Sequence, residues 1–125
     1  MRLLLDTHAL IWALDDPGRL PAKTRQAIDA GVVVFTSAAS IWEIAIKVAL
    51  RRLVFPIDEL PDALTDAAFQ ELPISIAHSL GAAGLPLLNR DPFDRLLVAQ
   101  ARYERLTLVT RDPAIRRYPV DTLWD

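Results

Sequence analysis

The chain has 125 residues, of which 52% are hydrophobic and 24% charged, with a formal net charge of −2, two histidines and no cysteine. This length and composition are typical of one compact domain, so we expect a single domain over residues 1–125 and exclude a disordered chain. The absence of cysteine excludes a disulfide framework and a thiolate metal site, and the charge excludes a polycation that binds nucleic acid with its whole surface.

The first half of the chain contains two predicted strands, each followed by a helix. The run RLLLD is apolar up to its final acid, and VVVFTS is rich in β-branched residues, as in buried strands. Pro21 stands at the first position of a predicted helix and Gly31 just past its end. The expected elements are a strand at 2–6, a helix at 8–14, a turn at 15–18, a helix at 21–30, a strand at 32–37 and a helix at 37–50.

The second half continues the alternation. The expected elements are a helix at 58–69, a weak strand at 74–76, a short helix at 77–84 ended by Gly84 and Pro86, a helix at 91–105, a strand at 106–110, a short helix at 112–118 and a last strand at 120–124. Strands that are apolar throughout and alternate with helices indicate a parallel sheet covered on both faces, which is an α/β fold. The carboxyl ends of all strands then share one edge, where ligands bind.

The amino terminus does not resemble a secretion signal, because Asp6 interrupts the apolar run where such a signal would continue. Glu43 and Lys47 interrupt the most apolar later stretch, so no membrane span is expected. We therefore expect a cytoplasmic protein.

Four acids stand where they can meet at the carboxyl edge of the predicted sheet. Asp6 ends the first strand, and Asp112 follows the strand at 106–110 by two residues. Glu43 lies about two turns into the helix after VVVFTS, and Asp94 lies in the first turn of the helix at 91–105. The beginnings of these two helices can project toward the same crevice.

Each acid also has a structural reading. Asp6 caps a helix in that reading, as do Asp91 and Asp112, each of which precedes a proline. Asp94 then occupies the third helical position, where negative charge suits the helix dipole. Ser40-Ile-Trp-Glu43 matches the spacing of a capping box, and Glu43 also stands four residues before Lys47, as in a helical ion pair.

The set of acids points to a bound cation. Carboxylates that converge repel one another, and a divalent ion removes that penalty. Oxygen ligands suit Mg²⁺, or Mn²⁺ as the alternative, whereas a chain without cysteine and with two histidines lacks the usual ligands of zinc. An acid cluster that holds Mg²⁺ is typical of phosphoryl chemistry.

Four segments in order carry a resemblance to a known family: LLLDTHALIW, SAASIWEIAIK, NRDPFDRLLVAQA and LTLVTRD. Together they make the whole chain resemble a PIN-domain ribonuclease, and within that family a VapC-type toxin of bacterial toxin–antitoxin pairs. The resemblance implies a three-layer α/β/α sandwich around a central parallel sheet. It also implies Mg²⁺-dependent hydrolysis of RNA phosphodiester bonds.

By the same resemblance, the conserved acids of the family correspond to Asp6, Glu43, Asp94 and Asp112. Asp6 and Asp94 are the implied principal metal ligands, with Glu43 and Asp112 completing the site directly or through water. Asp94 is preferred to Asp91 because it precedes the Arg-Leu-Leu run. Hydroxyls beside the acids are implied to orient carboxylates or water, namely those of Thr7, Ser37, Ser40 and Thr110. The implied partners are RNA, a second copy in a homodimer, and a cognate VapB-type antitoxin that covers the acidic crevice.

Other side chains near the acids have two readings each. Arg90, Arg95 and Arg111 either hold flanking phosphates or form a solvated face. For His8 and His78, and for Trp12 and Trp42, packing is favoured over catalysis or base stacking. Apolar residues on the helices at 8–14 and 38–50 exceed a single stripe, which is consistent with a homodimer.

Three alternative functions share this fold class. A phosphatase of the haloacid-dehalogenase type needs a second acid two residues after Asp6, where the chain has His8. A receiver domain needs a phosphoacceptor aspartate after a central strand, where VVVFTS ends in Thr36-Ser37. A non-catalytic binding module on the same fold stays open.

Overall fold

The protein is described by a computed structural model over residues 1–30 and 32–125. Its strands form one parallel sheet in the order β3-β2-β1-β4-β5. The strands are β1 (Arg2–Leu5), β2 (Val33–Ser37), β3 (Gln70–Leu72), β4 (Thr107–Val109) and β5 (Thr122–Leu123). The helices are α1 (Thr7–Asp15), α2 (Ala22–Asp29), α3 (Ala38–Ala49), α4 (Leu60–Asp66), α5 (Ile76–Ala83), α6 (Pro92–Glu104) and α7 (Pro113–Arg116), with 3₁₀ turns η1 (Pro17–Arg19) and η2 (Ile57–Glu59).

The first strand is the centre of the sheet. β1 pairs with β2 on one side and with β4 on the other, so that Leu5 lies opposite both Thr36 and Val109. The leucines of β1 are fully buried, as its unbroken apolar run predicts. The prediction of an all-parallel sheet is therefore confirmed.

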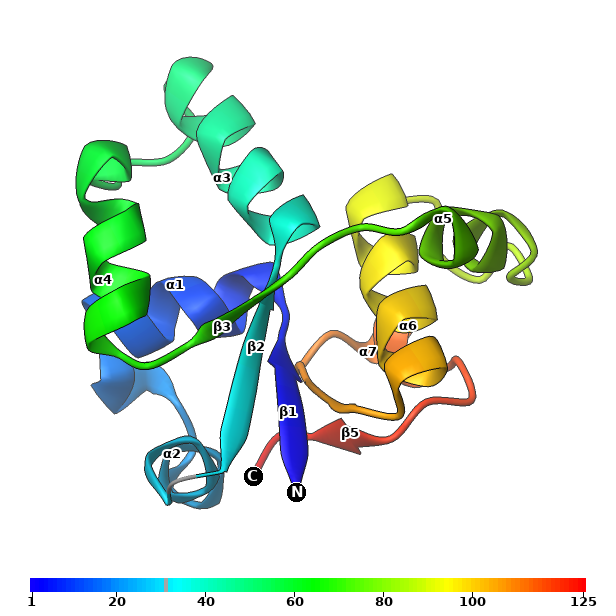
Figure 1. Cartoon of the computed structure of the whole chain (residues 1–125), viewed down its shortest axis with the longest axis horizontal. Helices are drawn as coiled ribbons and strands as arrows, with labels where there is room; N and C mark the ends of the chain where they lie inside the picture. The colour runs from blue at the N-terminus through cyan, green and yellow to red at the C-terminus, as the bar shows by residue number, and fades with distance from the viewer. Residues whose placement is uncertain (31) are drawn as a thin grey trace.

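Helices cover both faces of the sheet, and they do so in two groups (Figure 1). Leu4 packs with Leu97 and Leu108 on the face covered by α5, α6 and α7. Leu3 and Leu5 pack on the opposite face, which α1 to α4 cover. Alternate residues of one strand thus enter two different cores, and the expected α/β/α sandwich is confirmed.

Most predicted boundaries agree with the structure within two or three residues, but the third strand does not. The expected strand at 74–76 is wrong: Gln70–Leu72 forms β3, and Ile76 begins α5. Ser75 ends the extended stretch because it caps α5. Its hydroxyl accepts the amide of His78 at 3.1 Å, and His78 Nδ1 accepts the amide of Ser75 at 3.0 Å.

Two smaller expectations concern helix ends. Pro21 is the N-cap of α2 rather than its first residue. The cap role predicted for Gly31 lies outside the described residues. The helix expected at 58–69 is divided into η2 and a shorter α4. No helix in the described part of the chain is both long and apolar enough to cross a membrane.

Candidate active site

Two of the candidate acids lie at the carboxyl ends of β1 and β4, which are neighbours in the sheet. Asp6 follows β1 and caps α1, with its Oδ1 accepting the amide of Ala9 at 2.8 Å. Asp112 follows β4 and caps α7, with its Oδ1 accepting the amide of Ala114 at 2.9 Å. Both predicted cap roles are confirmed, and the two carboxylates line one pocket of about 240 Å³ together with His8, Arg111, Pro113 and Trp124.

Asp94 reaches the site from the first turn of α6. Asp91 caps this helix and accepts the amides of Phe93 and Asp94 at 2.9 and 3.2 Å, as predicted. The Oδ2 of Asp94 accepts a hydrogen bond from Asn89 Nδ2 at 3.1 Å. Asn89 Oδ1 also accepts the amide of Asp91 at 2.8 Å, so one amide side chain joins the cap to the candidate ligand.

The loop that carries Asn89 is held by Arg95 and Tyr118. Arg95 donates to the carbonyls of Ala82, Leu85, Pro86 and Asn89 at 2.8 to 3.3 Å. The hydroxyl of Tyr118 donates to Pro86 O at 2.8 Å and accepts the amide of Asn89 at 3.0 Å. The guanidinium is thus used by the loop, which differs from both readings given for Arg95, a phosphate contact and a solvated face.

Glu43 faces the site from α3 and is buried. Its Oε1 accepts the hydroxyl of Thr7 at 2.6 Å, and its Oε2 pairs with Lys47 Nζ at 2.8 Å. The predicted ion pair is confirmed. The predicted capping box is wrong, because Ser37 caps α3 through the amide of Ala39 at 3.0 Å, and Ser40 lies inside the helix. Direct ligation of a metal by Glu43 Oε2 would require release of Lys47.

The acids act on one another electrostatically. The pKa of Asp94 is raised from 3.8 to about 7, first by burial, then by the charge of Asp91, with further repulsion from Glu43 and Asp112, while the hydrogen bond from Asn89 opposes the rise. Burial also raises the pKa of Asp6, and the charge of Asp112 adds to it against hydrogen bonds from Thr110 and the amide of Ala9. Asp112 therefore acts on both Asp6 and Asp94, which makes the predicted acids one electrostatic cluster.

The candidate metal ligands are all carboxylate oxygens. Within residues 1–30 and 32–125, no three His, Cys, Asp or Glu side chains are placed so as to hold one ion together. Mg²⁺ does not need such a cage, because it keeps several waters and is commonly bound by one or two carboxylates. An all-oxygen cluster whose members repel one another is suited to a hydrated divalent cation.

The remaining candidate side chains are mostly structural. His78 is buried, its Nδ1 accepts the amide of Ser75, the cap of α5, and its Nε2 lies 2.9 Å from Glu104 Oε2, so its packing role is confirmed. His8 is exposed beside Trp12, which is itself buried. The sequence patterns did not predict the contacts of Asn89 and Tyr118 near Asp94. Asn89 stands two residues before Asp91, a spacing that allows an Asx turn, but no local pattern points to Tyr118.

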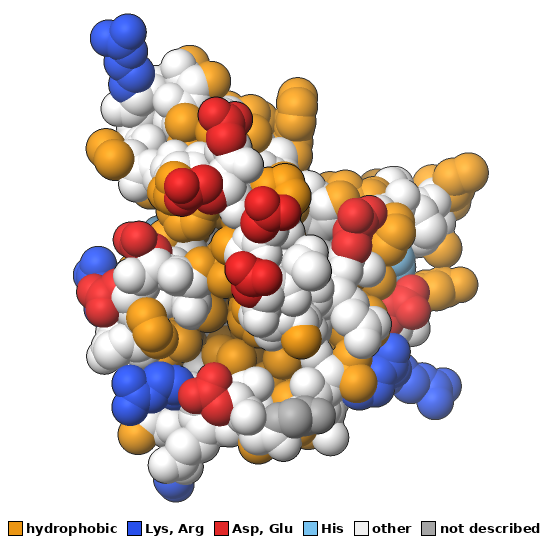
Figure 2. Space-filling view, turned by 60° about the vertical axis from the view of Figure 1, so that its left-hand side comes forward, with side chains coloured by type: hydrophobic (Ala, Val, Ile, Leu, Met, Phe, Trp, Pro, Cys, Tyr) orange, Lys and Arg blue, Asp and Glu red, His pale blue; other side chains and the backbone are white. Residues whose placement is uncertain are grey.

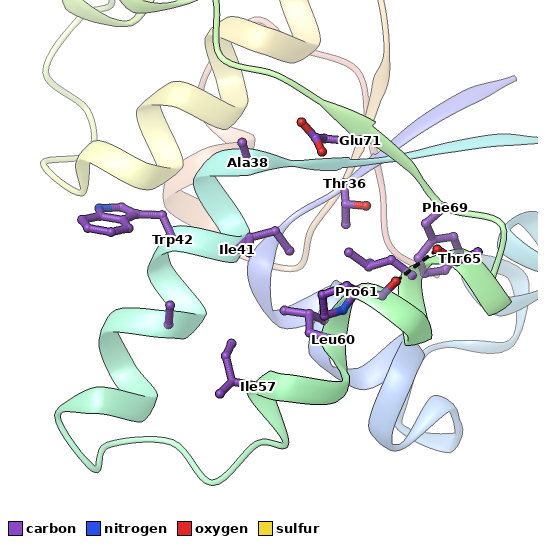
Figure 3. Close-up of a pocket in the computed structure, with 12 residues that line it drawn as sticks. Thr36, Ala38, Ile41, Trp42, Ile57, Leu60, Pro61, Thr65, Phe69 and Glu71 are labelled. Carbon is purple, nitrogen blue, oxygen red and sulfur yellow. Dashed lines mark hydrogen bonds between the residues drawn. The ribbon is translucent and has the colours of Figure 1, made fainter.

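The outer side of α3 borders a separate apolar groove of about 640 Å³, which we call the α3–α4 groove (Figure 3). Ile41 and Trp42 contribute from α3, and Ile57 and Leu60 from η2 and α4. Trp42 is 64% exposed, so of the two packing roles expected for it, in the core or at an interface, only the interface role stays open. Acidic side chains interrupt the apolar surface on this side of the molecule (Figure 2). The sequence from 53 to 89 contains five acids and no lysine or arginine.

Comparison with known proteins places this architecture in a family. The model of the PIN domain matches residues 3–121, and the chain therefore belongs to the PIN domain family. Within that family it is similar to "Ribonuclease VapC22" of Mycobacterium tuberculosis, with 31% identity over 129 residues and 98% of each chain covered.

Solved structures share the fold at lower identity. A VapBC2 complex from Rickettsia felis, bound to a DNA fragment from its promoter, matches with a TM-score of 0.71, 17% identity and 100% of both chains covered. A toxin–antitoxin complex from Klebsiella pneumoniae matches with a TM-score of 0.70, 19% identity and 97% and 95% of the two chains covered. Membership in this family leaves no support for the phosphatase and receiver readings.

Proposed function

We propose that the protein is a Mg²⁺-dependent endoribonuclease that acts in the cytoplasm as the toxin of a toxin–antitoxin pair. The observation that carries the proposal is the acid cluster at the carboxyl edge, where burial and then the charges of Asp91, Glu43 and Asp112 raise the pKa of Asp94 to about 7. Similarity over the whole chain to a protein named as a ribonuclease supports the same reaction.

Asp6 and Asp94 are the proposed principal ligands, because burial raises the pKa of both carboxyls and a cation would relieve that cost. When bound, the ion neutralises charge on the scissile phosphate and supplies Lewis acidity for attack by water. Asp112 completes the cluster beside Asp6. Thr7 and Lys47 fix the carboxylate of Glu43, and Asn89 fixes that of Asp94.

The activity is tested by incubating the purified protein with single-stranded RNA and Mg²⁺ or Mn²⁺. Asp6→Asn and Asp94→Asn should abolish cleavage, as should EDTA, whereas the control Asp62→Asn changes an exposed acid on α4 and should cleave normally. Equal cleavage by Asp94→Asn would place the reaction elsewhere or reveal a contaminant. Absence of cleavage by the unsubstituted protein would favour a non-catalytic binding module.

We propose that the antitoxin, which the resemblance expects to cover the acidic crevice, also seats an amphipathic segment in the α3–α4 groove. Large apolar side chains line the groove, and the segment that forms its α4 side carries acids without bases. A partner with apolar residues at helical spacing and flanking lysines or arginines is complementary to both features. The Klebsiella pneumoniae structure, which is named as a toxin–antitoxin complex, is consistent with a protein partner.

A homodimer is the second proposed assembly, but its surface differs from the expected one. The apolar residues of α1 are mostly internal, with Leu10 fully buried. Exposed large apolar side chains lie on α5, namely Ile76 and Leu80, and close to it in sequence, namely Ile74 and Leu87. Leu80→Glu should therefore convert a dimer to a monomer in analytical ultracentrifugation, whereas Val54→Glu, at another exposed apolar position, should not. A dimer that survives Leu80→Glu would place the interface elsewhere.

A further inference from the structure

Two arginines from distant parts of the chain stack on one tryptophan beside the acid cluster. The guanidinium carbon of Arg19, in η1, lies 4.5 Å from the centroid of the Trp12 ring. That of Arg111, two residues after β4, lies 4.7 Å from the same centroid. The indole also packs against Trp124, with ring centroids 5.8 Å apart. The buried ring of Trp12 therefore holds both guanidinium groups in place.

This arrangement adjoins the proposed catalytic acids. Arg111 and Trp124 line the same pocket as Asp6 and Asp112. Acidic and cationic side chains therefore line the same pocket. A cation-binding group next to an anion-binding group is what a metal-dependent reaction at a phosphodiester needs, because the substrate brings its own negative charge into an acidic site.

The guanidinium N–H groups of Arg19 and Arg111 are available to bind a ligand. Among the described residues, neither Arg19 nor Arg111 has a hydrogen bond or a salt bridge to a carboxylate; the salt bridges present join Glu43 to Lys47 and Glu104 to His78. Both arginines are exposed. Stacking uses the flat face of a guanidinium and leaves the N–H groups at its edge, which match phosphate oxygens.

We propose that Arg19 and Arg111 form a phosphate clamp that holds the backbone of single-stranded RNA against the Asp6–Asp112 side of the site. The clamp rests on the proposed nuclease function and names the residues that bind the substrate. Stacking on Trp12 fixes the two side chains in advance, so less conformational entropy is lost when they bind. Because the contacts are to phosphates, they add affinity without choosing a base sequence.

Salt dependence gives a direct count of such contacts. For single strands, the logarithm of the binding constant falls with the logarithm of salt concentration with a slope of about −0.7 for each phosphate neutralised. The dissociation constant of a fluorescent single-stranded RNA is measured in EDTA, which prevents cleavage, over a series of KCl concentrations. The variants are Arg19→Gln and Arg111→Gln, with Arg25→Gln on α2 as the matched exposed control.

Each clamp substitution should make the slope shallower by about 0.7 and weaken binding roughly three- to tenfold at low salt, while Arg25→Gln changes neither. Arg111→Lys, which keeps the charge, should retain the slope, and unchanged thermal midpoints exclude a loss of folding. With Mg²⁺, the clamp variants should raise KM while kcat at saturating RNA stays near that of the unsubstituted protein.

Unchanged slopes in both variants would overturn the clamp. The same unchanged slopes with weakened binding of the antitoxin would assign the arginines to the protein partner instead. The two levels of the proposal fail differently: a protein that cleaves RNA with both variants unaltered loses only the clamp, whereas an unsubstituted protein that does not cleave RNA loses the nuclease function itself.

Discussion

Replacing Asp94 by asparagine should stabilise the metal-free protein, although it removes a proposed catalytic ligand. The rise in the pKa of Asp94 from 3.8 to about 7 is roughly three units, each worth about 1.4 kcal/mol, so the full cost of the ionised carboxylate is about 4 kcal/mol. Partial exposure of Asp94 to water reduces this to about 2 kcal/mol. Loss of a charge at the start of α6 removes up to ~1 kcal/mol of favourable interaction with the helix dipole. The expected net gain is about 1 kcal/mol.

The effect has a defined dependence on pH. Between about pH 4 and pH 7 the folded chain keeps a proton on Asp94 that the unfolded chain has released, so the free energy of unfolding falls as pH rises through this window. The penalty is complete above pH 7 and absent below pH 4. Asp94→Asn should therefore exceed the unsubstituted protein in stability at pH 8, and most of that advantage should be gone at pH 5.

Urea denaturation in EDTA at the two pH values measures this difference, with Asp62→Asn as the control at an exposed site. A second measurement uses the cation: Mg²⁺ should raise the unfolding midpoint of the unsubstituted protein but not that of Asp94→Asn. The reasoning is refuted if Asp94→Asn is no more stable than the unsubstituted protein at pH 8, or if its advantage is equally large at pH 5.

Three further substitutions test the surroundings of the acids. Arg95→Met should destabilise the fold by about 3 kcal/mol in urea denaturation, because its hydrogen bonds to loop carbonyls are lost, and an effect below 1 kcal/mol would contradict this role. Lys47→Met should lower the midpoint of unfolding, because the buried carboxylate of Glu43 loses its ion pair with Lys47. Addition of Mg²⁺ should stabilise this variant more than it stabilises the unsubstituted protein. Equal stabilisation of both would show that Glu43 is not coupled to the ion. Trp42→Ala should weaken antitoxin binding at least tenfold in titration calorimetry without loss of RNA cleavage, since Trp42 is an exposed aromatic at the rim of the α3–α4 groove, and unaltered affinity would place the partner elsewhere.

Local sequence patterns predicted the buried strand β1 and the starts of α6 and α7, because residues close together in the chain determine these elements. The unbroken apolar run of β1 and the aspartate-proline pairs before α6 and α7 specify a buried strand and two capped helices without help from distant residues. The carboxyl-edge position of Asp6 and Asp112 follows from these elements and from the parallel sheet.

Other features depend on groups far apart in the chain. β3 is an edge strand with exposed residues at two of its three positions, and its place is set by pairing with β2 rather than by its own pattern. The role of Arg111 depends on the indole of Trp12, in the first helix, and that of Arg95 depends on carbonyls that only the folded loop brings together. No spacing of charges within the sequence distinguishes such arginines from solvated ones.

The central place of β1 has a consequence for the newly made chain. Leu3 needs Thr107 opposite it to complete the sheet, and Asp6 needs Asp112 beside it to complete the acid pocket. During synthesis β1 cannot pair with β4 until residues 107–109 have been translated, which is close to the end of the chain. Strand pairing over such a long sequence separation is slow. A prematurely terminated product that stops before β4 would therefore lack an assembled centre, so that any harm to the cell would begin only once translation of the message is nearly finished.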